Sequence, residues 1–63
     1  MAAPDLRTVK QVARERPAFT VASLRWLIFN AETNGLHYAL VRIGRRVLID
    51  LERFDQWIEG HRS

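Results

Sequence analysis

The 63-residue sequence contains no cysteine, three glycines and two prolines. The absence of cysteine excludes both a disulfide and a thiolate metal site. The two histidines, His37 and His61, are too isolated to chelate a metal ion, so no metal is expected. A chain of this length buries only about 60% of the surface that its unfolded form exposes. Stability must therefore come from a small aromatic and aliphatic core, or from oligomerisation.

The sequence also lacks a long hydrophobic run. No apolar stretch approaches the roughly 20 residues of a membrane helix, and the N-terminus lacks the apolar segment of a signal peptide. We therefore expect a cytoplasmic protein with no membrane partner. No set of residues resembles a nucleophile, a base and an oxyanion site, and Asp50 and Glu52 are better explained as carboxylates at a helix start. We expect neither an enzyme nor a cofactor.

Positive charge is in moderate excess. Ten Lys and Arg face seven Asp and Glu, which gives a formal net charge of +3. All of these cations except Lys10 are arginine, whose planar guanidinium suits phosphate and base-edge recognition. This balance raises the expectation of a polyanionic partner, although by itself it identifies none.

The longest apolar-rich stretch predicts a helix over residues 20–33. Thr20 is a suitable N-cap, and Asn34-Gly35 supplies a left-handed stop. At 3.6 residues per turn one face is suited to a core, and it contains Thr20, Leu24, Leu27, Ile28 and Ala31. Trp26 and Phe29 point roughly the other way. We expect the segment Gly35–Tyr38 and the following hairpin to cover Trp26.

A shorter helix precedes this one, over residues 8–14. Thr8 and Gln11 match a capping box, and Pro17 ends the helix because it disfavours helical angles at the residue before it. Residues 1–7 are expected to form a flexible tail. Residues 8–60 then make up the single domain.

After Gly35 the hydrophobic period changes to two, which predicts a β-hairpin around Gly44-Arg45-Arg46. A two-residue loop would suit a turn that begins with Gly, but it opposes Ile43 with Arg46. A three-residue loop opposes Ile43 with Val47 and keeps one apolar face continuous, so we favour it.

A last helix follows the hairpin. Asp50 is a natural N-cap, and Gly60 ends the helix. Its apolar face, which we assign to the core, carries Leu51, Phe54, Trp57 and Ile58. The fold class expected is mainly α with a small β-hairpin, in the order helix, helix, hairpin, helix.

The segment from Val41 to Arg46, a short strand, Asp50 and then Phe54-x-x-Trp57-Ile58 resembles the wing and closing helix of the excisionase-like DNA-binding proteins. This group includes the AlpA regulators and shares its fold with the DNA-binding part of MerR regulators. Thr8–Ala13 looks like the family's first helix, and Thr20–Arg25 looks like the start of its recognition helix. The resemblance covers residues 8–58 and implies a winged helix-turn-helix.

In such a fold the recognition helix enters the major groove with its N-terminal half leading. Thr20 and Ser23 would contact phosphate or base edges, and Arg25 could bind guanine with two hydrogen bonds. Thr20 could equally serve only as a cap. Arg45 and Arg46 at the hairpin tip would enter a minor groove. The weaker phosphate candidates are Arg16 and Lys10, and Arg42 could simply cover the hairpin's polar face.

The function expected from the resemblance is sequence-specific binding of double-stranded DNA. The protein would be an excisionase, or recombination directionality factor, of a phage or integrative element, located at the bacterial nucleoid. Its partners would then be DNA, an integrase, and further copies of itself side by side on DNA. The alternatives are a small transcription regulator of the same fold and a protein-interaction module that uses exposed Trp26 and Phe29 as anchors.

Overall fold

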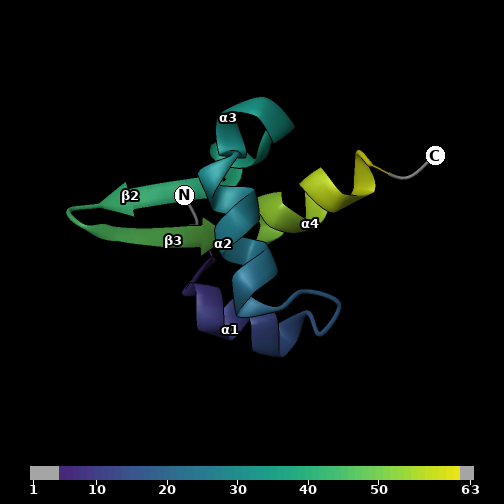
Figure 1. Ribbon diagram of the computed structural model, residues 1–63, viewed down its shortest axis with the longest axis horizontal. Helices are drawn as coiled ribbons and strands as arrows, with labels where there is room; N and C mark the ends of the chain where they lie inside the picture. Colours follow the sequence, from purple (N-terminus) through teal and green to yellow (C-terminus); the bar gives the residue numbers. More distant parts are fainter. Residues whose placement is uncertain (1–4, 62–63) are drawn as a thin grey trace.

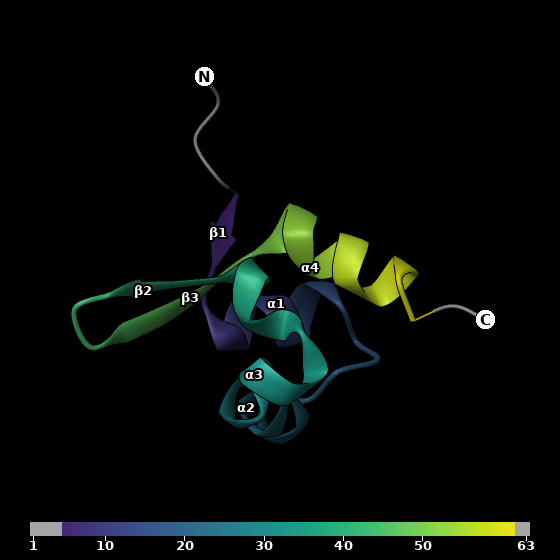
Figure 2. The ribbon, with the colours of Figure 1, turned by 90° about the horizontal axis from the view of Figure 1, so that it is seen from above.

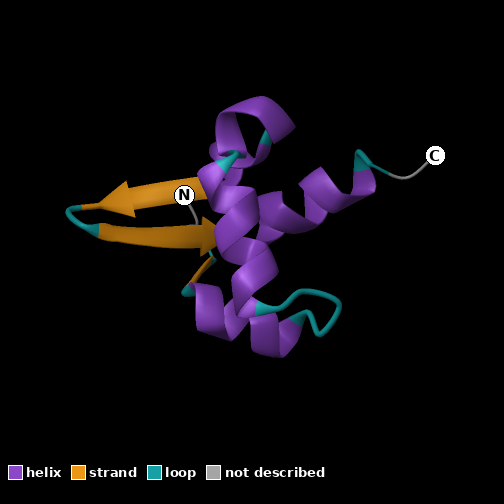
Figure 3. Cartoon of the chain, in the orientation of Figure 1, coloured by secondary structure: helices purple, strands orange, loops and turns teal. Residues whose placement is uncertain are grey.

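The computed structural model describes residues 5–61 as helices arranged around a small sheet (Figures 1 and 3). The elements follow in the order β1 (Leu6–Arg7), α1 (Val9–Glu15), α2 (Val21–Phe29), α3 (Ala31–Asn34), the 3₁₀ helix η1 (Leu36–Ala39), β2 (Leu40–Ile43), β3 (Arg46–Asp50) and α4 (Leu51–Glu59). The three strands form one antiparallel sheet in the order β1-β3-β2. The hairpin β2–β3 projects away from the helices, with α2 and α3 on one side and α4 with β1 on the other (Figure 2).

The capping signals place α1 as the sequence predicts. The Thr8 hydroxyl accepts a hydrogen bond from the Gln11 amide at 3.2 Å, and the Gln11 side chain accepts one from the Thr8 amide at 2.9 Å. Two otherwise unsatisfied donors of the first turn are thereby paired. The helix ends at Glu15, two residues before Pro17.

The expectation of a flexible tail over residues 1–7 is wrong for its last residues; residues 1–4 lie outside the described part of the chain. Leu6 pairs with Asp50 and Arg7 with Ile49, so β1 is an edge strand of the sheet. The Leu51 amide also donates to the Asp5 carbonyl at 2.9 Å. Strand β3 pairs with β2 along one edge, and the backbone amide and carbonyl groups of its other edge also need hydrogen-bond partners. Strand β1 supplies these partners.

The helix predicted over residues 20–33 is divided at Asn30. The Asn30 side-chain amide donates to the Trp26 carbonyl at 2.9 Å, a carbonyl that also accepts from the Asn30 backbone amide. Asn side chains compete in this way for the carbonyl groups of a helix. The Asn30 carbonyl then accepts from Thr33 and Asn34, which begins α3. Gly35, with φ of 82°, ends α3 as expected.

The link after Gly35 does not cover Trp26, contrary to expectation. Leu36 and Ala39 of η1 are fully buried, and the Tyr38 hydroxyl donates to the Arg53 carbonyl on α4 at 3.1 Å. The link therefore packs against α4. Trp26 is left 64% exposed.

The hairpin has the two-residue loop, so the register with Ile43 opposite Val47 is wrong. Ile43 pairs with Arg46, and Gly44 has φ of 59° while Arg45 does not have a positive φ. A positive φ at the first central residue alone is the signature of a turn that begins with Gly. Ile43 is 55% exposed, so pairing it with Val47 in the three-residue loop would remove little additional apolar surface from water. Turn geometry therefore decides the register.

The core draws on every helix and on β3. Its buried apolar residues are Val12, Leu24, Ala31, Leu36, Ala39, Ile49, Leu51 and Phe54. Phe19 packs edge-on against Phe54 at 5.1 Å between ring centroids. Trp57 is only half-buried at the rim of this core, where its indole N–H donates to the Asn34 carbonyl at 2.8 Å. As expected, Asp50 caps α4 by accepting from the Arg53 amide.

The sequence thus predicted the helices and the hairpin, but the sheet has a third strand. The molecule is a small α/β domain in which helices pack on a three-stranded antiparallel sheet. Within residues 5–61 no helix is long and apolar enough to span a membrane.

Candidate nucleic-acid interface

The outer side of α2 is open to solvent while its inner side is held by the core. Leu24 is fully buried, whereas Trp26 is 64% and Phe29 is 88% exposed. The exposed residues of the helix are Ala22, Ser23, Arg25, Trp26 and Phe29. Val21–Phe29 contains no Asp or Glu, so this surface carries only the positive charge of Arg25.

The start of α2 is fixed by a second capping box, which engages Thr20 and Ser23 with each other. The Ser23 hydroxyl accepts from the Thr20 amide and donates to the Thr20 carbonyl, both at 2.9 Å. The Thr20 hydroxyl accepts from the Ser23 amide at 3.0 Å. Of these two residues, therefore, only Thr20 has a hydroxyl hydrogen free for an acceptor outside the described chain. The capping interpretation of Thr20 is confirmed.

The hairpin tip places three arginines in solvent. Arg42, Arg45 and Arg46 are all exposed, and none of them forms an ion pair with any residue that the structure describes. The hairpin projects away from the helices (Figure 1), although Arg42, nearest its base, lines the same hollow as Glu32 of α3. Like charges so close together favour an anionic neighbour.

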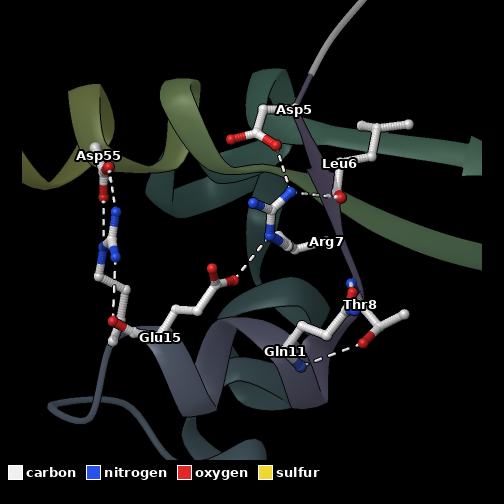
Figure 4. A network of polar contacts seen from close by, with 8 residues as sticks. Asp5, Leu6, Arg7, Thr8, Gln11, Glu15 and Asp55 are labelled. Carbon is white, nitrogen blue, oxygen red and sulfur yellow. Dashed lines mark hydrogen bonds and ion pairs between the residues drawn. The ribbon is translucent and has the colours of Figure 1, made fainter.

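Arg16 has a different environment from the other predicted contacts. Its guanidinium binds Asp55 of α4 with two hydrogen bonds, of 2.9 and 2.7 Å (Figure 4). This hydrogen bonding lowers the pKa of the Asp55 carboxyl and raises that of Arg16 from their ordinary values. Arg16 therefore joins the end of α1 to α4, and its guanidinium is already occupied by a carboxylate.

The remaining ion pairs lie on the same part of the molecule as β1 and α4. Arg7 binds both Asp5 and Glu15, and these bonds raise the pKa of its guanidinium (Figure 4). Arg53 lies 3.7 Å from Asp50. The carboxylates of the described chain thus mostly neutralise arginines of β1, α1 and α4.

A group of cations remains without an ion pair in the described chain: Lys10, Arg14, Arg25, Arg42, Arg45 and Arg46. They lie on α1, α2 and the hairpin. The sequence interpretation missed Arg14 and gave Arg42 only a covering role. Arg14 follows Lys10 by four residues and so shares its helix face, a signal that was present in the sequence.

A hollow of about 490 Å³ lies between the end of α2, α3 and strand β2. Its lining is partly apolar and partly polar: Ile28, Phe29, Asn30, Ala31, Glu32, Thr33, His37, Leu40 and Arg42. It connects the aromatic side of α2 with the basic hairpin. No group of three or more His, Asp or Glu side chains within residues 5–61 is placed to hold a metal ion.

Comparisons of the chain with protein-family models, curated proteins and solved structures found no match. The resemblance to excisionase-like proteins therefore stays a prediction from the sequence.

Proposed function

We propose that this domain binds double-stranded DNA as a small winged helix-turn-helix. In this proposal α2 is the recognition helix in the major groove, and the β2–β3 hairpin is the wing in an adjacent groove. The element order and the resemblance of residues 8–58 to excisionase-like proteins support this assignment.

The observation that carries the proposal is the distribution of uncompensated positive charge. The ion pairs of Arg7, Arg16 and Arg53 neutralise the side formed by β1 and α4. Arg25 on α2 and the arginines of the hairpin tip have no such partners in the described chain. A surface of this kind attracts phosphates and releases their condensed counterions.

Each element then has a distinct role. Arg25 would read a base edge, with guanine as the preferred partner because its O6 and N7 match a guanidinium. Arg45 and Arg46 would contact the backbone or a narrow minor groove. Lys10 and Arg14 would bind phosphates, which position the protein without reading sequence. Arg16 is not included, because Asp55 holds it.

The resemblance implies two biological roles. As an excisionase, the protein would bend DNA, bind as several copies side by side and help to place an integrase. As a small transcription regulator, it would occupy an operator. Binding without chemistry suffices for both roles.

Titration of the ¹⁵N-labelled protein with a mixed-sequence DNA duplex tests the proposal. Amide resonances of residues 20–29 and 42–46 should shift, while those of the outer side of α4 should stay in place. Shifts confined to β1 and α4, or no shift at low salt, would refute the proposed interface.

The exposure of Trp26 and Phe29 favours a second candidate, a protein-interaction module. Aromatic residues and arginine are common anchors at protein interfaces. If the domain binds a protein and not DNA, addition of the DNA duplex should leave the amide resonances of the labelled protein unchanged. Trp26→Ala should then abolish binding to a protein partner without altering the melting temperature.

A further inference from the structure

The exposed side of α2 forms one continuous stripe. Ala22, Arg25, Trp26 and Phe29 follow the spacing i, i+3, i+4, i+7 of a single helix face. Trp26 is 64% and Phe29 is 88% exposed, so the core uses neither ring fully. Two large aromatic side chains side by side on a small domain are the kind of surface that a ligand covers.

The surroundings of this stripe restrict the chemistry of that ligand. Val21–Phe29 carries no carboxylate, and Arg25 lies between the apolar residues. Phe29 and Arg42 line the same hollow, which joins the aromatic stripe to the basic hairpin and whose one carboxylate, that of Glu32, lies on α3 and not on α2. A ligand that covers both must present apolar groups next to dense negative charge. The major groove of DNA does so, because phosphates border a floor that displays the C5-methyl groups of thymine.

We infer that Trp26 and Phe29 read thymine methyl groups in the major groove, beside a guanine bound by Arg25. This inference rests on the proposed DNA binding and names the sequence that α2 would select. Ala22, at the N-terminal end of the stripe, is small enough to let the helix approach the base edges closely.

Helix geometry sets the spacing of the two base types. Phe29 lies four residues beyond Arg25, which is about 6 Å along a helix axis. Successive base pairs are about 3.4 Å apart. With α2 lying along the groove, a thymine contacted by Phe29 falls about two base steps from the guanine. The Trp26 ring, next to Arg25, would reach a thymine adjacent to that guanine.

Replacement of thymine by uracil tests this directly, since uracil lacks only the methyl group. Duplexes are first selected from a random-sequence pool with the intact chain. Each thymine of a selected duplex is then replaced by uracil, one at a time, and the Kd is measured by fluorescence anisotropy. One or two positions close to an essential guanine should lose roughly fourfold in affinity each, the effect of one buried carbon group. The other positions should be unaffected.

Variants of the stripe link that loss to the protein. Trp26→Ala and Phe29→Ala should each bind the thymine duplex more weakly, and each should no longer distinguish thymine from uracil at the position that its own ring contacts. Both should melt within a few degrees of wild type, because the rings are exposed. Tyr38→Phe is the matched control: it keeps an aromatic ring outside the stripe and removes only the hydroxyl contact to α4. It should retain the full difference between thymine and uracil.

The outcomes separate the inference from the proposed function. Tight binding with uracil tolerated at every position overturns the reading of methyl groups and leaves DNA binding in place. Equal losses by both variants on thymine and uracil duplexes overturn it as well. If the selection retains no duplex, both the inference and the proposed function fail.

Discussion

Arg16 and Arg25 illustrate how identical side chains acquire different roles. Arg16 ends α1 and is held by Asp55 through two hydrogen bonds. Arg25 lies on the solvent side of α2 and pairs with no residue of the described chain. Nothing in the sequence near Arg16 indicated Asp55, which lies 39 positions further on. The pair forms only because α4 packs beside the end of α1.

Removal of Arg25 should weaken DNA binding in a sequence-dependent way. Arg25→Ala is expected to lose about 1–3 kcal/mol of binding free energy at a selected site and much less on random duplexes. Its melting temperature should be unchanged, since the residue is exposed. Competition between selected and random duplexes measures the effect, with Arg25→Lys as the control that keeps the charge. Equal losses on all duplexes would remove base reading from Arg25.

Loss of the Asp55 charge should change how stability depends on pH. The pKa of Asp55 is lowered in the folded state by its hydrogen bonds from Arg16. The ionised Asp55 therefore contributes fully to the free energy of unfolding above the ordinary aspartate pKa of about 3.9. This contribution is lost as the pH falls through the lowered pKa of the folded state. Asp55→Asn should melt below wild type at neutral pH, and the two curves should converge on acidification.

A control separates this ion pair from a general charge effect. Glu52 lies on the same helix and is exposed, with no ion pair among residues 5–61. Glu52→Gln should show a smaller convergence than Asp55→Asn, because Glu52 lies in the first turn of α4 and interacts only with the helix start. A difference between Asp55→Asn and wild type that stays constant across the acid range would show that the charge of Asp55 does not stabilise the fold.

At the scale of elements, the hairpin turn depends on the backbone of one glycine. Gly44 has φ of 59°, and an added Cβ would meet no atom within 4 Å. Gly44→Ala should therefore destabilise through backbone strain alone, by about 1 kcal/mol. For a domain of this size that lowers the melting temperature by about 4–8 °C.

Gly60 offers a matched substitution. Its φ of −64° and ψ of −16° are helical, and a new Cβ would meet the carbonyl oxygens of Trp57 at 3.4 Å and Gln56 at 3.7 Å. Gly60→Ala should thus be close to neutral. An equal loss of stability in both variants would contradict the assigned turn conformation.

The elements that could be predicted are those determined by neighbours in the sequence. The capping boxes at Thr8 and Thr20, the N-cap Asp50 and the glycine stops at Gly35 and Gly60 each act over three or four positions. They placed every long helix to within a few residues, except for the division at Asn30. That division depends on a side-chain hydrogen bond that periodicity does not reveal.

The elements that could not be predicted depend on distant contacts. Strand β1 exists because Leu6 and Arg7 lie beside β3, more than 40 positions along the chain. The exposure of Trp26 depends on the path of η1, which packs mainly on α4 and less on α2. For the candidate interface, the sequence indicated Arg25, Arg45 and Arg46 as surface cations. The sequence could not show that the Arg16 guanidinium forms an ion pair with Asp55.

At the scale of the whole molecule, the ion pairs divide the surface into two parts. The side with β1, the end of α1 and α4 carries most of the carboxylates and the arginines bound to them, whereas Glu32 lies on α3. The cations without partners in the described chain lie on α1, α2 and the hairpin. The formal net charge of +3 therefore understates the positive electrostatic potential over the proposed interface on α1, α2 and the hairpin.

The salt dependence of duplex binding tests the proposed function most directly. If Lys10, Arg14, Arg45 and Arg46 each neutralise a phosphate, log affinity should fall with log salt concentration at a slope of about −3.6. Affinity should then drop by roughly two orders of magnitude between about 50 and 200 mM salt. The double variant Arg45→Ala/Arg46→Ala should reduce the slope by about half. A slope near zero, or no duplex binding at low salt, would contradict the electrostatic interface on α2 and the hairpin.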